Sequence, residues 1–328
     1  MNNIKAQKDN SKIMVSVIIL TYNHEKYIRQ ALDSVLMQDV DFKYEILIGD
    51  DASTDNTSKI LQEYQKNNPE IIKIVLRKEN LGPTRNAYEL FLLAKGKYLA
   101  TCEGDDFWIS SDKLRKQVQF LEEQSEYIGC SHISKIVNEQ GVPLKRQRLS
   151  WVCYKQCMTL KDFKGYFLPG QASSLVRRNI YNENANCKLS FFYQIHFAIG
   201  DRTTALIYLS KGKFFQFKEA MGCYRVATKT DSITKKLYSN NKNWLIEDLA
   251  YTQRLMKFSK EILCAKVDFH FYLAYLLISA LFQFIIHHNK ISKKLLLQIW
   301  NTAPNKRKII FQLPFALWKK TINHFFLI

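Results

Sequence analysis

The first third of the chain alternates between short apolar runs and longer segments that repeat apolar residues at helical spacing. Four runs have the length and composition of strands buried in a parallel sheet. They cover residues 14–20, 44–48, 71–76 and 98–102. Each segment between them has one apolar face, as an amphipathic helix does. The order predicts an α/β fold with a doubly wound, mostly parallel sheet, right-handed crossovers and flanking helices.

Polar residues follow each predicted strand at the point where it ends. The groups are Thr21, Tyr22 and Asn23 after the first strand, Asp50 and Asp51 after the second, Arg85 in the helix start after the third, and Glu103, Asp105 and Asp106 after the fourth. Open α/β sheets bind ligands at the carboxyl ends of their strands. We therefore expect these groups to converge along one edge of the sheet.

Two local predictions concern helix starts. Ser53 or Thr54 is expected to cap the helix that carries Ile60 and Leu61. Asp162 has the position of a capping acid at a second helix start.

Glu103, Asp105 and Asp106 place three carboxylates within four positions. Adjacent acids repel each other and suit a cationic partner, such as a divalent metal that carries phosphates. Taken alone, the cluster fits a solvated acidic turn at least as well. The other polar groups on neighbouring strand ends favour a binding site.

Two nucleotide-binding classes are excluded by the loops. The first turn, residues 20–24, has no glycine, so it lacks the fingerprint of a dinucleotide fold. No GxxxxGK[ST] sequence is present, which excludes a P-loop enzyme. A nucleotide held without a glycine loop needs another source of positive charge at its phosphates, such as a metal on the acidic cluster.

Four sequence blocks, in this order and spacing, resemble the family 2 glycosyltransferases. They are VSVIILTYN at 15–23, DDASTDNT at 50–57, NLGPTRN at 80–86 and EGDD at 103–106, followed by Trp108 and KLRKQ at 113–117. Members of that family are inverting enzymes of the GT-A fold that use nucleotide-activated sugars. The resemblance is close over residues 13–125 and looser over 126–233.

The resemblance assigns roles to the strand-end residues. Thr21, Tyr22, Asn23, Asp50, Asp51 and Arg85 would bind the nucleotide. Asp105 would be the main ligand of Mn²⁺ or Mg²⁺, with Glu103 and Asp106 beside it. Many relatives also carry a histidine after the Tyr-Arg pair that corresponds to Tyr224 and Arg225. Here residues 227–230 read Ala-Thr-Lys-Thr, so Lys229 or Arg225 is left to neutralise phosphate.

An inverting transfer needs a carboxylate that takes a proton from the acceptor hydroxyl. Asp162, Glu183 and Asp201 are the downstream candidates. Gly200-Asp201 matches the family's position for this base, and we predict Asp201 as the catalytic residue. The alternative is an acid that stabilises the start of a helix through its dipole.

The domain prediction has four parts. Residues 1–12 form a polar tail with no signal peptide, 13–125 the nucleotide-sugar half, 126–235 the acceptor half, and 236–328 a basic, apolar, helical extension. Residues 269–286 are apolar enough to raise the question of a membrane span, although a packed helix is favoured. Lysines and aromatic residues alternate beyond residue 290, which suits an anionic membrane surface; a helical cap with solvated lysines is the alternative.

Charge and cysteines bear on partners and compartment. The 328 residues carry a formal net charge of +18, which indicates a polyanionic partner or simply a soluble basic surface. Seven scattered cysteines without a CxxC pair are typical of reduced thiols. We expect a cytoplasmic protein associated with the inner face of the cell membrane.

The sequence therefore predicts a metal-dependent, inverting hexosyl- or N-acetylhexosaminyltransferase. It would move one sugar from a UDP-type donor to a glycan or lipid-linked acceptor in cell-surface polysaccharide synthesis. Transfer of a single sugar is expected because no QxxRW motif is present. The alternatives are an inactive relative that serves as a scaffold and a basic nucleic-acid-binding protein. No nucleic acid is expected as a partner, because the acidic cluster would repel a phosphate backbone.

Overall fold

The computed structural model describes residues 12–181, 192–226, 244–287, 290–325 of the chain. The chain divides into two compact units. Unit 1 comprises Met1–Ser134, Gln171–Cys187 and Phe217–Tyr224, and unit 2 comprises Lys135–Gly170, Lys188–Gln216 and Arg225–Ile328. The segment predicted as the acceptor half, residues 126–235, contributes to both units. The predicted four-part division remains a proposal.

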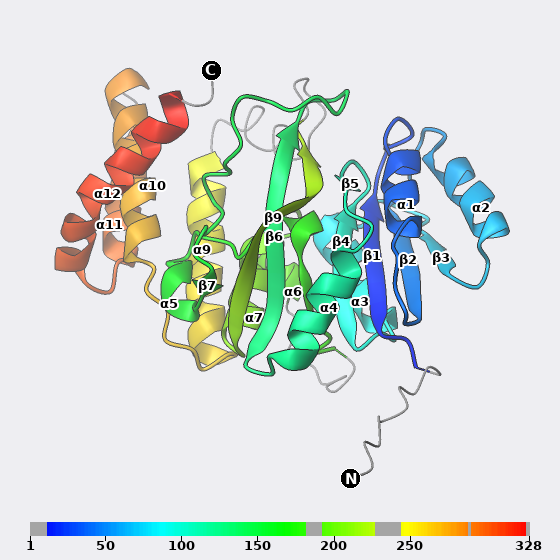
Figure 1. Cartoon of the computed structure of the whole chain (residues 1–328). Helices are drawn as coiled ribbons and strands as arrows, with labels where there is room; N and C mark the ends of the chain where they lie inside the picture. The colour runs from blue at the N-terminus through cyan, green and yellow to red at the C-terminus, as the bar shows by residue number, and fades with distance from the viewer. Residues whose placement is uncertain (1–11, 182–191, 227–243, 288–289, 326–328) are drawn as a thin grey trace, which may run out of the picture. The chain divides into compact units, whose positions relative to one another are not determined.

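Unit 1 contains the predicted parallel strands (Figure 1). They are β1 (Val15–Thr21), β2 (Tyr44–Asp50), β3 (Ile72–Leu76) and β4 (Tyr98–Glu103), in the spatial order β3-β2-β1-β4. Helices α1 (Ile28–Leu36), α2 (Thr57–Asn67) and α3 (Pro83–Leu93) connect them. Val17, Ile18 and Ile19 of β1 are fully buried, as a central parallel strand requires. The predicted alternation of strand and helix is confirmed.

The sheet continues beyond β4 with antiparallel pairs. The order after β4 is β8-β6-β9-β5, and a further strand, β7, pairs with β9. These strands are β5 (Phe107–Trp108), β6 (Tyr127–Val137), β7 (Cys157–Met158), β8 (Val176–Arg178) and β9 (Lys213–Arg225). Helix α4 (Lys113–Glu123) follows β5, and the 3₁₀ turn η1 (Ala172–Ser174) precedes β8. The result is a mixed sheet with a parallel half and an antiparallel half.

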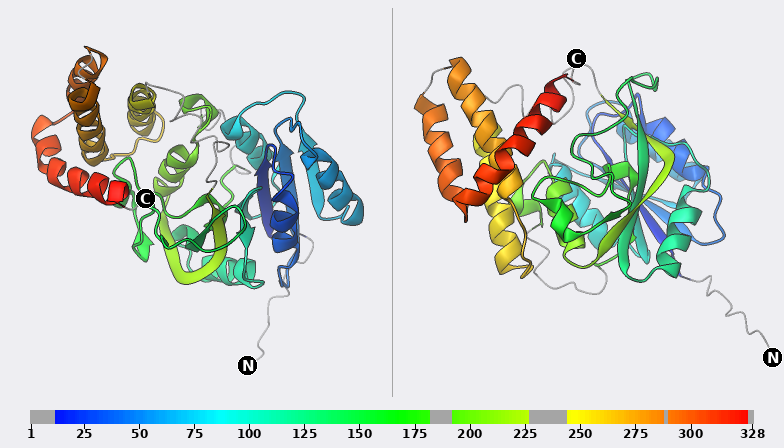
Figure 2. Two further views of the ribbon diagram at one scale, coloured as in Figure 1. Left: turned by 90° about the horizontal axis from the view of Figure 1, so that it is seen from above. Right: turned by 60° about the vertical axis from the view of Figure 1, so that its left-hand side comes forward.

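Unit 2 is mainly helical. Its helices are α5 (Leu160–Phe163), α6 (Phe192–Ile195), α7 (Asp201–Leu209), α9 (Trp244–Glu261), α10 (His270–His287), α11 (Lys290–Thr302) and α12 (Lys306–Phe325). Helix α10 packs against α9, α11 and α12, drawn from yellow to red in Figures 1 and 2. The predicted C-terminal helical extension is confirmed. Among the residues that the structure describes, no helix is long and apolar enough to cross a membrane.

A buried charge network joins the helices of unit 2. Arg202 of α7 donates to the carbonyl of Gly165 at 2.8 Å, to Asp248 of α9 at 2.9 Å and to Thr252 at 3.0 Å. Its guanidinium also lies 4.1 Å from the ring centroid of Tyr272 in α10. Because Asp248 accepts a second hydrogen bond from the Tyr272 hydroxyl, both charges of the pair are compensated.

One of the two predictions about helix starts is wrong. Helix α2 begins at Thr57 with Asn56 at its N-cap, because the Ser53 hydroxyl instead bonds to Asp50. The second is confirmed, since Thr159 and Asp162 form a reciprocal capping box at α5.

Candidate active site

The strand register brings three of the predicted polar groups together. Thr21 is paired with Asp50 between β1 and β2, and Leu20 with Glu103 between β1 and β4. The backbone N–H of Asp51 donates to the carbonyl of Thr21 at 3.0 Å. The expected convergence of these groups at one edge of the sheet is therefore confirmed for the ends of β1, β2 and β4.

Gly104 allows the acidic cluster to approach the first loop closely. A Cβ atom there would lie 2.6 Å from His24 Nδ1 and 2.9 Å from the carbonyl oxygen of Leu20. The backbone N–H of Gly104 donates to that same carbonyl at 2.9 Å. The glycine is thus required by packing between the ends of β1 and β4.

Two polar atoms beside this contact lack a hydrogen-bond partner within the described part of the chain. Thr21 Oγ1 and His24 Nδ1 are both buried and unpaired. A buried polar atom without a partner is costly, so such atoms often mark a place where a ligand or water binds. In the sequence His24 is only part of the first turn; its place beside the acids follows from the position of Gly104.

Asp50 and Asp51 are adjacent in sequence but have different partners. Asp50 accepts hydrogen bonds from the hydroxyls of Ser53 and Ser58. Asp51 accepts from the backbone N–H groups of Leu81 at 2.8 Å and Gly82 at 2.9 Å. Burial raises the pKa of Asp51, although these bonds and the charge of Arg77 act in the opposite direction. Both carboxylates shape the loops that follow β2 and β3.

Asn23 joins the first loop to the second. Its backbone adopts a left-handed conformation with φ of 56°, which asparagine tolerates better than most residues. Its side-chain oxygen accepts from the N–H of Thr54 at 2.8 Å, and its own N–H donates to Ser53 Oγ at 2.9 Å. Tyr22, beside it, is partly exposed.

Arg77 is a cation near this edge that sequence analysis missed. It follows β3 and donates to Asn86 Oδ1 at 3.1 Å and to Glu89 at 2.5 Å, while its Nη2 is buried without a partner in the described residues. Arg85, the predicted cation, is more exposed and pairs with Glu89 at 3.0 Å. The rule that polar residues follow each strand would have selected Arg77, since it comes directly after Leu76.

The three acids after β4 differ in burial. Asp106 is almost fully buried, and its Oδ2 accepts from Gln171 Nε2 at 2.7 Å and Ser173 Oγ at 2.6 Å. Ser173 Oγ also accepts from the N–H of Glu103 at 2.9 Å. The side chains of Glu103 and Asp105 are half-buried. The turn η1 therefore fixes Asp106, and the other two acids keep contact with solvent.

These residues fit a divalent ion that shares its coordination with a ligand. No group of three or more His, Cys, Asp or Glu side chains in the described residues forms a ready metal cage. Mg²⁺ is typically held by one or two carboxylates together with water and substrate phosphates. Glu103 and Asp105 supply two such carboxylates. The roles of Asp105, Asp106 and Glu103 as metal ligands stay predictions.

Among the candidates for the base, Asp201 is the first residue of α7 and is exposed; its helix is capped by Gly200. Asp162 is engaged in the capping box and in a bond from Lys155. Glu183 and Lys229 lie outside the described residues. Arg225 is buried and donates to the carbonyl of Glu139 at 2.6 Å. Asp201 thus stays the predicted base.

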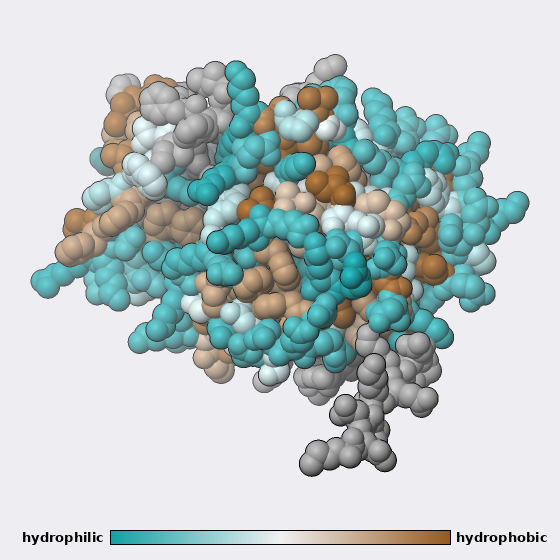
Figure 3. Space-filling view, viewed as in Figure 1, coloured by the Kyte–Doolittle hydropathy of each residue, from teal (hydrophilic) through white to brown (hydrophobic). Residues whose placement is uncertain are grey.

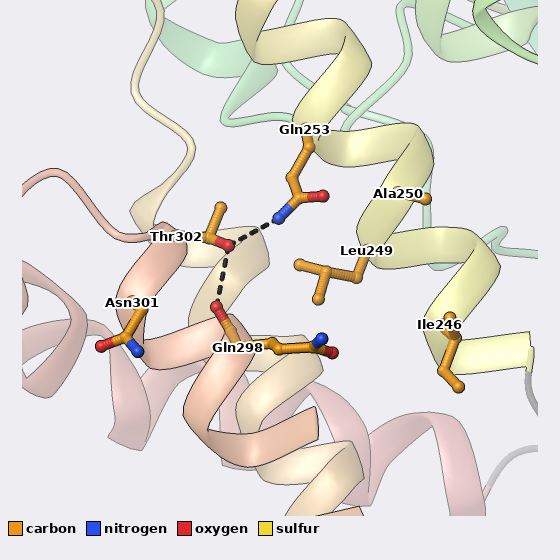
Figure 4. A pocket seen from close by; sticks show the side chains of 7 residues that line it. All are labelled: Ile246, Leu249, Ala250, Gln253, Gln298, Asn301 and Thr302. Atoms are coloured by element: carbon orange, nitrogen blue, oxygen red, sulfur yellow. Dashed lines mark hydrogen bonds between the residues drawn. The ribbon is translucent and has the colours of Figure 1, made fainter. Parts of the chain in front are cut away.

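A shallow pocket of about 540 Å³ lies within unit 2, between α9 and α11 (Figure 4). Gln253 donates across it to Thr302 at 2.8 Å. Gln298, Asn301 and aliphatic side chains of α9 complete its lining. None of its lining residues is titratable, so the pocket offers no group for acid–base chemistry.

Residues 16–184 of the chain match the family described as Glycosyl transferase family 2. This chain belongs to that family. An uncharacterized protein of Mycobacterium tuberculosis is 41% identical over 127 residues, which is 39% of this chain and 37% of that protein. The putative teichuronic acid biosynthesis glycosyltransferase TuaG of Bacillus subtilis is 38% identical over 137 residues, 42% of this chain and 53% of TuaG. The matched segment thus spans only about a third to a half of the curated relatives.

Solved structures agree with the fold. Residues 1–349 of S. aureus TarS, crystallised in complex with UDP-GlcNAc, superpose with a TM-score of 0.64 at 18% identity, covering 94% of this chain and 88% of TarS 1–349. The family match and this likeness confirm the predicted GT-A fold and the family resemblance.

Proposed function

We propose that this glycosyltransferase family member moves a single sugar, with inversion, from a UDP-type donor to a glycan or lipid-linked acceptor in cell-surface polysaccharide synthesis. The observation that carries the proposal is the meeting of Thr21, Asp51 and the Glu103–Asp106 cluster at the carboxyl edge of the sheet. The printed name of TuaG supports the surface-polymer context, and the UDP-GlcNAc bound by TarS supports the donor class. The sugar is a hexose or an N-acetylhexosamine.

Donor binding is assigned to the loops after β1, β2 and β3. Thr21, Tyr22, Asn23, Asp50, Asp51 and Arg85 form the proposed nucleotide-binding set. We add Arg77 because its Nη2 is a buried donor without a partner in the described residues. Thr21 Oγ1 likewise offers a buried hydroxyl to a base or ribose edge.

The donor's diphosphate is proposed to lie beside the acidic cluster. Asp105 and Glu103, next to Asp106, would hold a Mn²⁺ or Mg²⁺ ion, which supplies positive charge to the departing diphosphate. Asp106, bonded to Gln171 and Ser173, keeps the cluster fixed to η1. Gly104 lets the cluster lie against Thr21 and His24.

The proposed transfer is one displacement at the anomeric carbon. Asp201 accepts the proton of the acceptor hydroxyl while that oxygen bonds to the sugar and the bond to the diphosphate breaks. The nucleoside diphosphate leaves with the bonding electron pair. Asp201 is at the first turn of α7, where the helix dipole favours the charged carboxylate and so limits its strength as a base.

The test combines binding and transfer. The purified full chain is screened by thermal shift against UDP-sugars and other nucleotide sugars, with and without Mn²⁺ or Mg²⁺. Metal-dependent stabilisation by at least one donor is expected, and its absence across the panel would refute the proposal. Asp201→Asn should keep donor binding and lose transfer. Glu247→Gln, an exposed acid in the first turn of α9, is the matched control and should keep both.

The site of action is proposed as the cytoplasmic face of the cell membrane, where nucleotide sugars and lipid-linked acceptors meet. Contact with the membrane is proposed to be peripheral. Fractionation of cells that express the full chain tests this, since a peripheral protein is released from membranes by high salt.

A further inference from the structure

Helix α12 exposes a row of large apolar side chains. Phe311, Phe315 and Trp318 are 79%, 63% and 65% exposed, and they follow the i, i+4, i+7 spacing that places them on one helix face. Ile310 and Leu317 are exposed beside them. We call these five residues the aromatic face of α12.

The aromatic face is not the face that packs within unit 2. Ile309 and Ala316 of α12 are fully buried, and α12 packs against α10. A surface helix of a globular protein normally has one apolar stripe, directed at the core, and polar residues elsewhere. Helix α12 therefore has a second apolar stripe that unit 2 does not use. Figure 3 shows apolar atoms among hydrophilic ones at its left side, where Figure 1 draws α11 and α12.

The two lysines near the end of α12 show the opposite of the usual pattern. Lys319 and Lys320 are only half-exposed, while the neighbouring Trp318 is largely open. Lys320 donates to Ser279 of α10 at 2.7 Å, and burial lowers the pKa of both lysines. Both lysines therefore pack against unit 2, which leaves the neighbouring apolar side chains as the exposed part of this end of the helix.

The positive charge of the C-terminal helices indicates which partner covers the aromatic face of α12. After Asp268 the sequence contains eight lysines and arginines and no aspartate or glutamate. Three of them, Lys306, Arg307 and Lys308, form the exposed first turn of α12. A second copy would bring the same unbalanced positive charge to this face and be repelled. An anionic lipid surface offers both an apolar layer for the aromatic side chains and negative charge for the cations.

We infer that α12 is a membrane-docking helix that lies in the plane of an anionic phospholipid surface, with Phe311, Phe315 and Trp318 inserted between headgroups and Lys306, Arg307 and Lys308 on the lipid phosphates. This deepens the proposed function, on which it rests for the location of the acceptor. The docking itself needs no sugar donor, so the two ideas are tested separately.

The test is co-sedimentation of the full chain with vesicles of phosphatidylcholine, with and without phosphatidylglycerol. Binding is expected with the anionic vesicles and should weaken as salt increases. Phe311→Ser/Phe315→Ser/Trp318→Ser should lower the partition coefficient roughly tenfold or more. The Gln triple variant of Lys306, Arg307 and Lys308 should also lower it roughly tenfold or more. Leu92→Ser/Leu93→Ser, which alters two exposed leucines of α3, is the matched control and should bind like wild type.

Separate readouts keep the result interpretable. UDP binding is measured on each variant and should be unchanged, because no substituted residue belongs to the proposed donor site. If the aromatic triple variant does not fold, quenching by brominated lipid in wild type and Trp318→Phe replaces it; quenching should be lost with Trp318. Equal vesicle binding by the triple and control variants would overturn the inference. A dimer in light scattering that the triple variant abolishes would overturn it too, in favour of a second copy.

Discussion

Replacing Arg202 with methionine should destabilise unit 2 strongly while sparing the nucleotide site. Arg202 is 9% exposed and donates to the Gly165 carbonyl, Asp248 and Thr252. Methionine fills much of the same volume but removes the charge and all three donors. Asp248 would then remain a buried carboxylate whose compensation comes from Tyr272 alone among these groups.

The expected cost follows from this loss. Breaking a buried ion pair by removing one partner costs about 3–5 kcal/mol, because the other charge is left uncompensated. The guanidinium's contacts with the Tyr251 and Tyr272 rings are lost as well, which raises the expected free-energy cost toward the upper end of that range. For a domain of 150–250 residues, 1 kcal/mol shifts Tm by about 2–4 °C, so a decrease of roughly 6–20 °C is expected.

The assay is chemical denaturation of wild type, Arg202→Met, Asp248→Asn and the double variant. The double variant should lose about 1–3 kcal/mol less than the sum of the two single variants, because the residues are directly bonded. Arg202→Lys should fall between wild type and Arg202→Met, since lysine keeps the charge but lacks the guanidinium fork. A loss below about 1 kcal/mol for Arg202→Met, or strict additivity in the cycle, would refute the reasoning.

Three further outcomes are expected. Gly104→Ala should weaken UDP binding at least roughly tenfold in calorimetry, because its Cβ would displace His24 and the end of β1; unchanged affinity would contradict the packing argument. Burial lowers the pKa of Lys113 to about 7, so between about pH 7 and 10.5 the unfolded chain binds one more proton than the folded chain. The free energy of unfolding of wild type, relative to that of Lys113→Met, should therefore rise with pH across that window. If the free energies of unfolding of the two proteins change in parallel with pH, the prediction is wrong. Asp106→Asn should cost about 1–3 kcal/mol in denaturation, since Oδ2 accepts two buried bonds, whereas Asp105→Asn should remove the metal-dependent part of UDP binding.

The parallel half of the sheet was predictable because each of its strands is a short apolar run in the sequence. A strand buried on both faces must be apolar throughout, so β1 and β2 were found within one or two residues of their bounds. The antiparallel half carries no such signal. Strand β8 has three residues and includes Arg177 and Arg178, and β5 has two, so partners distant in sequence define them.

The position of the candidate site was predictable from the sequence, but the hydrogen-bond partners of its residues were not. Sequence placed Asp50, Asp51 and the acidic cluster at strand ends, and register confirms that placement. The partners were hidden, because Ser173 and Gln171 are more than sixty residues from Asp106 in the chain. Arg77 directly follows β3, as the strand-end rule requires, but the burial of its Nη2 depends on packing and could not be predicted from the sequence.

The neighbouring carboxylates Glu103, Asp105 and Asp106 differ in burial, and we propose that they differ in role for this reason. The Oδ2 atom of Asp106 accepts hydrogen bonds from Gln171 and Ser173, so protonation or loss of this carboxylate would first reduce fold stability. Glu103 and Asp105 keep contact with solvent, as the proposed role of metal ligands requires. The acidic cluster therefore combines a carboxylate held by Gln171 and Ser173 with two carboxylates that we propose as metal ligands. Gly104, between Glu103 and Asp105, allows the acidic cluster to lie beside Thr21, because any side chain there would push the ends of β1 and β4 apart.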